Sequence, residues 1–223
     1  SWTKATGTGY NSIIANVFRI QYSSSYSYIS CHSIPSYSIG PWSNPNTPSA
    51  QNFTFKLPLN PTVQSGTKTV APLGHIGIWS NGVSVYNADD GQTYNNLGIW
   101  NRNAYFWEGS SFDSCKGHAD GSSEYHNHVN PICMYTSSST SHSSLIGFAF
   151  DGYPIYGPYG YSTATDSSSG IRRMLTCYKE RTYSNNQRTS LPNGTTLTSS
   201  QYGPSVSTTY PIGAFIQDYK YDS

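Results

Sequence analysis

The histidines of this chain are unevenly distributed, and their spacing suggests a metal site. Three of the six, His118, His126 and His128, lie within eleven residues, in a segment closed at both ends by cysteines. His126 and His128 are two residues apart, so in an extended segment both imidazoles leave the same face. With Asp120 from the preceding loop they would supply three nitrogens and a carboxylate. Divalent transition metals prefer such a set of ligands.

The metal we expect is copper or zinc. Three histidines with an open coordination position suit Zn²⁺ or Cu²⁺, and an oxidising extracellular setting permits copper. We expect His75, Tyr125 and His142 in the layer behind the ligands, with His75 or His142 as an alternative fourth ligand. The competing interpretation is a structural cluster, in which the imidazoles and Asp120 only satisfy one another's hydrogen bonds.

Two similar hairpins flank the histidine segment in the sequence. Residues 76–86 (IGIWSNGVSVY) align without gaps on residues 146–156 (IGFAFDGYPIY). Asn-Gly and Asp-Gly are the preferred dipeptides of two-residue type I′ turns, in which both central residues have a positive φ. Such turns would form two cross-strand pairs that we expect in the core, Ile78 with Val85 and Phe148 with Ile155. A loop held between two rigid hairpins is a usual place for a functional site.

The rest of the chain has the pattern of a β protein. Short alternating runs, such as 17–28 and 53–57, are bounded by Gly, Pro, Asn and Ser, and helical periodicity is almost absent. Residues 213–219 are a further candidate strand. Long irregular loops are predicted where prolines repeat or apolar residues are scarce, over residues 33–51, 164–170 and 184–207. We therefore predict an all-β fold, one domain over residues 1–223, with antiparallel sheets in a sandwich-like arrangement.

The composition favours a secreted, extracellular protein. Only 10% of residues are charged, against a usual value of about 25%, and the net charge is +1, so no basic patch is available for a nucleic acid. No apolar run approaches the length of about 18 residues that a membrane span needs. The chain begins without methionine, as a mature product would. Sequons at Asn52 and Asn193 would accept N-glycans.

The four cysteines suit an oxidising compartment and permit three pairings. We predict Cys115 with Cys133 and Cys31 with Cys177, because the first bridge would join the two ends of the histidine segment. In the chain-entropy description, a bridge closing a loop of that length is worth about 3 kcal/mol. A site made of four cysteine ligands is a weaker alternative, because the chain has no CxxC pair.

Other catalytic patterns are weak. The chain has no GxSxG motif for a nucleophilic serine. Two pairs of carboxylates could act in glycoside hydrolysis, Glu108 with Asp113 or Asp120 with Glu124, but any such pair among eleven acids has little specificity. The many tyrosines and tryptophans could form a carbohydrate-stacking surface, although packing in the core and on the sheets explains them more simply.

The histidine segment and its flanks resemble the YHYH domain family, which is named for a tyrosine-histidine-tyrosine-histidine motif. The resemblance is carried by the segment GHADGSSEYHNH, by the hairpin before it and by LIGFAFDGYPIYGP after it. It extends over nearly the whole chain through two further segments, SIPSYSIGPWSNPNTPSAQNFTFKLPLNP and YPIGAFIQDYKY. Asn127 stands where the motif has its second tyrosine. The resemblance implies a secreted β domain with a histidine site rather than a particular reaction. It also implies that an acidic and asparagine/glycine tail of the family is missing after Ser223.

Three functions from different classes agree with these features. The one we favour is a secreted extracellular metal-binding β domain with a structural or recognition role. The second is a self-assembling subunit of an extracellular fibre or coat, suggested by low charge, many Tyr and Ser residues and strands that could pair between copies. The third is a copper- or zinc-dependent oxidoreductase or hydrolase, whose metal would activate water or oxygen. Further copies of the chain and glycans are the expected partners.

Overall fold

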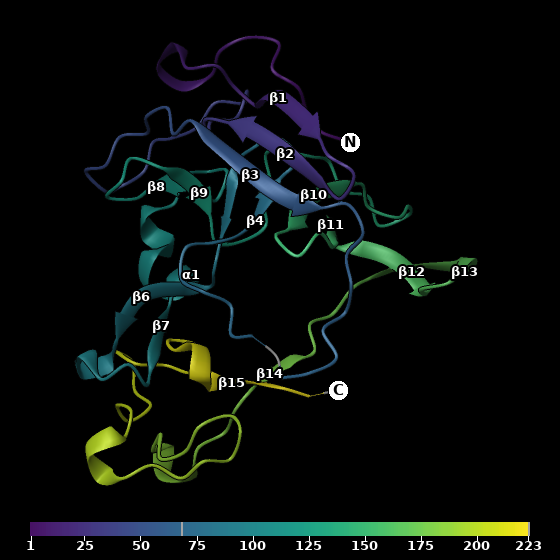
Figure 1. Ribbon diagram of the computed structural model, residues 1–223. Helices are drawn as coiled ribbons and strands as arrows, with labels where there is room; N and C mark the ends of the chain where they lie inside the picture. Colours follow the sequence, from purple (N-terminus) through teal and green to yellow (C-terminus); the bar gives the residue numbers. More distant parts are fainter. Residues whose placement is uncertain (68, 223) are drawn as a thin grey trace. The chain divides into compact units, whose positions relative to one another are not determined.

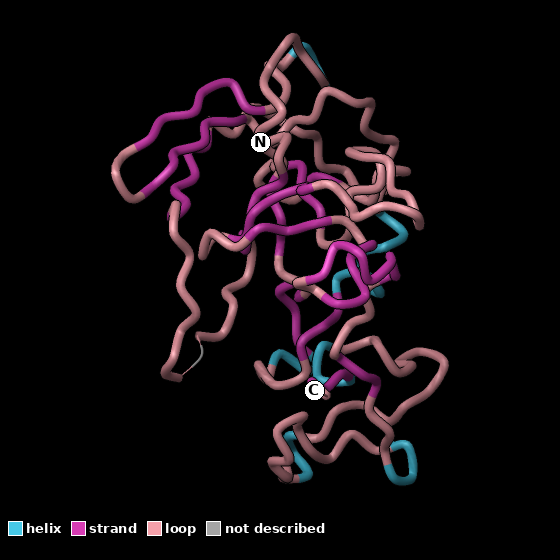
Figure 2. The backbone as a smooth tube through the Cα atoms, turned by 90° about the vertical axis from the view of Figure 1, so that its right-hand side faces the viewer, coloured by secondary structure: helices cyan, strands magenta, loops and turns pink. Residues whose placement is uncertain are grey.

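A computed structural model describes residues 1–67 and 69–222 (Figure 1). The described residues form fifteen short strands in five sheets, with one α-helix, α1 (Ala104–Glu108), and several 3-10 turns. Long loops connect these elements (Figure 2). The prediction of an all-β fold built from antiparallel sheets is confirmed.

The chain divides into two compact units, which are described separately. Unit 1 comprises Ser1–Asn87 and Ser110–Met174, and unit 2 comprises Ala88–Gly109 and Leu175–Ser223. The organisation as a single domain stays a prediction. The histidine segment belongs entirely to unit 1.

The main sheet of unit 1 has six strands in the order β11-β10-β4-β5-β9-β8. Their bounds, in that order, are Pro154–Tyr156, Leu145–Ala149, His75–Trp79, Ser84–Tyr86, Tyr125–Asn127 and His118–Ala119. Neighbouring strands are antiparallel except for β5 and β9, which are parallel. One sheet therefore joins both predicted hairpins, β4-β5 and β10-β11, to the histidine segment in β8 and β9.

The hairpin turns differ from the predicted type I′ turns. In the first hairpin, the Trp79 N–H donates to the Val83 carbonyl oxygen at 2.8 Å, which closes a loop of three residues. Within that loop Gly82 has a positive φ of 84° and Asn81 does not. The second hairpin repeats this geometry around Gly152. A three-residue loop with glycine in the left-handed region is the next most common hairpin connection.

The additional loop residue shifts the pairing register of both hairpins by one. Val85 lies opposite Gly77 instead of Ile78, and Ile155 lies opposite Gly147. The predicted pair of Phe148 with Ile155 is therefore wrong for the same reason as the pair of Ile78 with Val85. The prediction that these residues lie in the core agrees better with the structure. Ile78 and Val85 are buried, and Ile155 is partly buried against the core.

The two hairpins lie next to each other through β4 and β10. Ile78 faces Phe148 in this antiparallel pair, with Trp79 opposite Gly147 and Gly77 opposite Ala149. Ile78 and Phe148 are equivalent positions of the aligned sequences, so the register has two-fold symmetry about this pair. The internal repeat is thus the unit that builds the centre of the sheet.

A second sheet of unit 1 consists of β1 (Val17–Tyr22), β2 (Tyr26–Cys31) and β3 (Phe53–Pro58), all antiparallel. The run predicted over 17–28 is broken by a turn, in which Ser23 Oγ accepts from the Tyr26 N–H at 3.1 Å. Apolar side chains of this sheet pack with Ile78 of the main sheet in a common cluster. The two sheets therefore share a core, as expected of a sandwich-like arrangement.

One predicted loop of unit 1 is a hairpin. Residues 164–165 form the turn between β12 (Tyr159–Thr163) and β13 (Asp166–Arg173), and residues 166–170 belong to β13. The strand β13 is mostly exposed and begins with Asp166 and three serines, so it offers no hydrophobic alternation from which to predict it. Residues 33–51, all of them described, contain neither helix nor strand, as predicted.

Unit 2 contains α1 and two small antiparallel sheets. The strands are β6 (Asp89–Thr93), β7 (Asn101–Asn103), β14 (Tyr178–Glu180) and β15 (Tyr219–Tyr221). Residues 213–219, predicted as a strand, instead hold a 3-10 turn over Ile216–Asp218, and only Tyr219 enters β15. The segment 184–207, predicted as a loop, contains no strand or α-helix but has two short 3-10 turns, Ser184–Asn186 and Ser199–Gln201.

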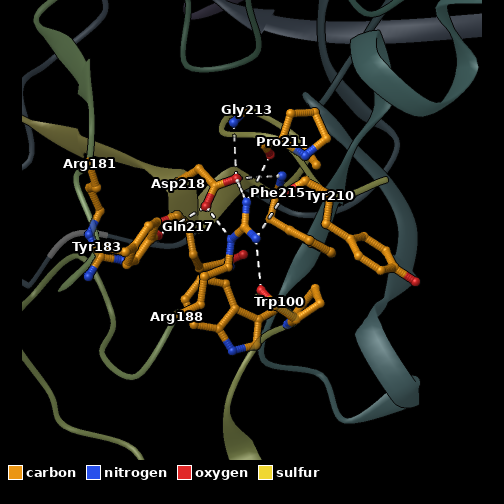
Figure 3. A network of polar contacts seen from close by, with 12 residues as sticks. Trp100, Arg181, Tyr183, Arg188, Tyr210, Pro211, Gly213, Phe215, Gln217 and Asp218 are labelled. Atoms are coloured by element: carbon orange, nitrogen blue, oxygen red, sulfur yellow. Dashed lines mark hydrogen bonds and ion pairs between the residues drawn. The ribbon is translucent and has the colours of Figure 1, made fainter. Parts of the chain in front are cut away.

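A buried ion pair organises unit 2 (Figure 3). Arg188 Nε lies 2.7 Å from Asp218 Oδ1, and both side chains are fully buried. The other guanidinium nitrogens donate to Asp218 Oδ2 and to the carbonyl oxygens of Pro204, Tyr210 and Pro211. Every donor of the guanidinium is satisfied, which is the condition under which a buried charge is tolerated.

One of the two predicted disulfides is present. Cys115 and Cys133 are bonded, whereas Cys31 and Cys177 are free thiols, the first buried and the second exposed. The predicted Cys31–Cys177 bridge is therefore not formed: Cys31 lies in the core cluster around Ile78, and burial raises the pKa of its thiol to about 12. Among the described residues, no helix has the length and apolar character that crossing a bilayer requires.

Candidate metal site

Strands β8 and β9 bring the three histidines together. The strands pair antiparallel, with His118 directly opposite His126. His128 follows two residues later, so its ring leaves the same face of the chain as that of His126. Each residue presents one nitrogen to the group, and the three nitrogens lie within 4.8 Å of one another. The sequence spacing predicted this grouping.

The Nε2 atoms of the cluster point at one another. His126 Nε2 lies 3.1 Å from His118 Nε2 and 3.1 Å from His128 Nε2. The rings of His118 and His126 are buried, at 5% and 1% exposure, and His128 is half-buried. His126 is therefore the central member, and His128 is the one most open to solvent.

Backbone carbonyls fix the tautomers of two of the rings. His126 Nδ1 lies 3.0 Å from the Glu124 carbonyl oxygen, and His128 Nδ1 lies 2.5 Å from that of Asn87. Because a carbonyl oxygen only accepts, both Nδ1 atoms carry the hydrogen. In the neutral rings each Nε2 then has only a lone pair, and these two lone pairs face each other at 3.1 Å. Two such lone pairs repel each other unless a proton or a cation lies between them.

The ring of His118 is held by side chains, whereas those of His126 and His128 are held by backbone carbonyl oxygens. Its Nδ1 lies 2.7 Å from Ser111 Oγ and 3.4 Å from Asn44 Nδ2, and the ring of Phe112 packs against it edge-on at 4.8 Å. A hydroxyl can donate or accept, so the Ser111 contact allows His118 to direct a lone pair from Nε2 into the cluster. All three rings thus have a partner at Nδ1, which histidines that bind metals usually require.

The electrostatic environment keeps His126 neutral. Burial lowers the pKa of its imidazole well below the usual value, and the neighbouring charges of His128 and His118, when protonated, lower it further. The hydrogen bond to the Glu124 carbonyl opposes this shift. A neutral ring retains the lone pair with which it would coordinate a metal.

Asp120, which we predicted as a ligand, lies outside the histidine group. Its Oδ1 accepts from the N–H groups of Ser122 at 2.8 Å and Glu124 at 3.0 Å, and its Oδ2 accepts from the Tyr86 hydroxyl at 2.9 Å. The carboxylate therefore closes the turn between β8 and β9, which is a common use of aspartate in turns. It reaches the histidines only through Tyr86.

A polar network of buried groups lies behind His126. Glu124, 3% exposed, has Oε1 at 2.7 Å from His75 Nε2 and accepts from the Tyr86 hydroxyl through Oε2 at 3.0 Å. The Tyr86 ring stacks on His126. Burial and the negative charges of Glu124 and Asp120 raise the pKa of Tyr86, so the phenol keeps its proton. His75 thus contacts Glu124, and its role behind the ligands stays a prediction.

Tyr125 and Asn127 leave the opposite face of β9, as the alternation predicts. Tyr125 is fully buried and its hydroxyl donates to Asp113 Oδ2 at 2.9 Å, while Asn127 Nδ2 donates to the Lys116 carbonyl oxygen at 2.7 Å. Both contacts hold the loop around Cys115, which precedes His118. Tyr125 therefore positions the loop from the far side of the strand, instead of lying behind the ligands as predicted.

His142 does not join the site. Its ring packs against Tyr156 and Tyr161, and its Nδ1 lies 2.8 Å from the Ser143 carbonyl oxygen. It is neither a fourth ligand nor a supporting residue of the histidine group. The prediction failed because a lone histidine in a sequence carries no indication of which surface it faces.

Sequence reasoning missed the partners of the ligand rings. Asn87 acts through its backbone carbonyl, which any residue would provide, and Ser111 is one of many serines, so neither had a usable signal. Glu124 could have been found. It is two residues before His126, so its side chain leaves the same face of the segment as the histidines.

The geometry thus defines a β-rich protein with a largely buried three-histidine cluster inside a disulfide-closed loop. Residues 54–223 match the family described as YHYH protein, so the chain belongs to the YHYH family. No curated protein and no solved structure shows a significant match to the chain. Asn127 stands in the second tyrosine position of the motif, and its amide fixes the Lys116 loop instead.

Proposed function

We propose that this protein is a secreted, extracellular domain that binds one divalent transition metal ion, copper or zinc. The ligands are the Nε2 atoms of His118, His126 and His128. One observation carries the proposal: His118, His126 and His128 each place a ring nitrogen within 4.8 Å of the other two, and carbonyl oxygens hold the hydrogen of His126 and His128 at Nδ1.

The spacing of the nitrogens suits such an ion. Two ligands at the usual Zn–N distance of about 2.0–2.1 Å and a tetrahedral angle are separated by about 3.3 Å. Both Nε2–Nε2 contacts of His126 are 3.1 Å, close to that value, whereas the group as a whole extends to 4.8 Å, so the outer rings would move toward each other on binding one ion. Imidazole ligands suit zinc and copper alike.

A structural or recognition role is the one we favour for the metal. His118 and His126 are buried and lie on paired strands, so an ion bound to them would cross-link β8, β9 and the chain that follows β9. The Cys115–Cys133 bridge closes the same segment and supports an oxidising, extracellular location. Metal and disulfide would together hold a segment that has little regular structure.

Metal analysis of purified protein tests the proposal. After stripping with a chelator and incubation with Zn²⁺ or Cu²⁺, we expect about one equivalent of metal to stay bound by elemental mass spectrometry. His126→Ala should abolish this binding, because it removes the central ligand, whereas the matched control His142→Ala should retain it. Wild-type protein that retains no metal, or a His126→Ala variant that binds like wild type, would show the proposal to be wrong.

A copper- or zinc-dependent oxidoreductase or hydrolase is the second candidate. The observation that favours it is the number of ligands, since the described residues supply three, and three protein ligands with one open position are typical of catalytic zinc sites. Azide added to the Co²⁺- or Cu²⁺-loaded protein tests this alternative. A shift of the visible spectrum would reveal an exchangeable position, and an unchanged spectrum would favour the structural role.

A further inference from the structure

Unit 2 carries an open groove that has no part in the metal site. Its volume is about 860 Å³, within the range of about 300–1,000 Å³ that is usual for ligand sites. The walls come from the segments around Asn101, Asn193 and Gln217 and from the strands β14 and β15. All of these residues belong to unit 2, which supplies none of the three histidines.

Exposed tyrosine rings line one wall of the groove. Tyr178 on β14 and Tyr221 on β15 are directly opposite in the strand pair, and their rings meet edge-to-face at 5.7 Å. They are 58% and 63% exposed, so most of each ring faces solvent. Tyr219 lines the groove from the same strand. Flat apolar faces with polar tips, open to solvent, are a surface on which an amphipathic ligand can stack.

The polar groups of the groove are almost all neutral. Gln217 Oε1 accepts from the Asn101 N–H at 2.7 Å, which fixes the orientation of the Gln217 amide. Its Nε2 has no hydrogen-bond partner among the described residues, and Gln217 lines the groove. Thr195 and Thr196 add hydroxyl groups, and Lys220 is the one charged side chain among the described lining residues.

This combination selects the ligand class. Phosphate-bearing or acidic ligands call for clustered arginine or lysine side chains, which this groove lacks. A neutral sugar has apolar C–H faces that stack on aromatic rings and hydroxyls that exchange hydrogen bonds with amides and hydroxyls. We propose that the groove of unit 2 binds a neutral glycan.

Two sources could supply that glycan. Asn193, in the sequon Asn193-Gly194-Thr195, lies exposed in the groove wall, so a glycan attached to it would start inside the groove. An oligosaccharide of the extracellular surroundings has the same chemistry. The proposal is independent of the metal site, and failure of either leaves the other standing.

Binding measurements on the full chain produced in a bacterial host, and therefore free of N-glycans, test the proposal. The probes are cellohexaose, laminarihexaose, maltohexaose, N-acetylchitohexaose and a free oligomannose N-glycan, each followed by calorimetry and saturation-transfer NMR. At least one should bind and show contacts with tyrosine ring protons. If none of the five binds, the proposal is overturned.

Variants locate the binding in the groove. Tyr178→Ala should weaken binding about tenfold or more, the equivalent of roughly 1.4 kcal/mol, while Tyr178→Phe keeps the ring and should retain the affinity. Gln217→Glu keeps the oxygen that accepts from Asn101 but removes the Nε2 donor, and should also weaken binding. Tyr105→Ala removes an exposed tyrosine of α1 outside the groove and is the matched control. Affinity unchanged in Tyr178→Ala and Gln217→Glu would overturn the proposal.

Protein from a glycosylating host distinguishes the two sources. If the Asn193 glycan occupies the groove, the glycosylated protein should not bind the probe, and Asn193→Gln from the same host should bind it. If the ligand is external, glycosylated protein and Asn193→Gln should bind the probe alike. Both results support a glycan groove, and they assign its occupant.

Discussion

The phenol ring of Tyr86 stacks on the imidazole of His126, with ring centroids 3.8 Å apart and planes inclined by 16°. The hydroxyl of the same tyrosine lies between Asp120 Oδ2 and Glu124 Oε2, at 2.9 and 3.0 Å. The hydroxyl has one proton, so Asp120 and Glu124 share a single donor and the hydrogen bonding of the two carboxylates is coupled. Through its stacked ring, Tyr86 connects this network to His126. The last strand of the first hairpin is in this way connected to the metal ligands.

Tyr86→Phe tests this connection, because it keeps the stacked ring and removes only the hydroxyl. Asp120 retains its two backbone donors and Glu124 retains His75, so we expect a loss of stability of about 1 kcal/mol in urea unfolding. Metal affinity should fall about tenfold, as is usual when a group supporting a ligand is removed. Tyr86→Ala should cost more on both measures, and equal effects of the two substitutions would refute a role for the ring.

The stability of the metal-free protein should decrease as the pH falls below about 6.5, the ordinary pKa of histidine. His126 has a pKa well below that value in the folded state, because of burial and the nearby histidines. The unfolded chain therefore binds a proton that the folded protein excludes, and acid favours unfolding until the folded pKa is also passed. Chemical unfolding in the presence of a chelator, from pH 8 to pH 5, measures the slope.

A His126→Gln variant serves as the control for that pH series. It cannot titrate at this position, so the slope between pH 7 and pH 5 should be shallower than in wild type. Identical slopes in the two proteins would assign the acid sensitivity to other groups. Bound metal should be released over the same range of pH, because protons compete for the Nε2 lone pairs.

Removal of the Cys115–Cys133 bridge by the double substitution to serine should destabilise the protein by about 3 kcal/mol. The two cysteines are 18 positions apart in the sequence, and the segment between them includes all three histidines, so metal affinity should fall as well. Cys177→Ser is the matched control, since this thiol is free and exposed. Loss of stability without loss of metal affinity would show that the histidines hold their geometry without the bridge.

The sequence predicts those parts of the candidate site that depend on residues close together in the chain, and it does not predict contacts between distant segments. The grouping of His118, His126 and His128 depends on local alternation and one short turn, so spacing alone predicts it. Asp120, expected as a ligand, lies outside this group, and its Oδ1 accepts from the Ser122 and Glu124 amides of its own turn, which spacing does not reveal. The partners of the rings come from distant segments and act partly through the backbone, which carries no sequence signal.

In the fold too, elements formed by neighbouring residues were predicted, whereas pairings between distant segments were not. The internal repeat predicted both hairpins, but the choice between a two- and a three-residue loop depends on whether one or both central residues take a positive φ, and Asn-Gly allows either. The pairing of the repeats with each other through Ile78 and Phe148 is a contact between distant segments. The serine-rich strand β13 is held by backbone pairing with β12, which leaves no apolar pattern.

Gly77→Ala should destabilise unit 1 because the centre of the repeat has no room for a side chain. A Cβ atom at Gly77 would lie 2.6 Å from the Phe148 carbonyl oxygen, and one at the equivalent Gly147 would lie 2.7 Å from that of Ile78. Overpacking of this kind costs about 1–3 kcal/mol. Gly66→Ala, where nothing lies within 4 Å of the added atom, should leave the thermal midpoint unchanged. A Gly77→Ala variant as stable as wild type would contradict the close packing of β4 on β10.

Asp218→Asn should destabilise unit 2 strongly, because it leaves the Arg188 guanidinium charged and without its counter-ion in a fully buried position (Figure 3). Asparagine has nearly the same shape, so the effect reports charge and hydrogen bonding instead of lost volume. Breaking a buried pair by removing one partner costs about 3–5 kcal/mol.

Lys179→Ala, which removes an exposed ion pair with Asp222, is the control and should change stability little. Chemical unfolding followed by tryptophan fluorescence is a suitable measurement, since Trp100 packs in the buried cluster of unit 2. A loss no greater than that of Lys179→Ala would mean that the carbonyl oxygens around Arg188 compensate its charge without Asp218.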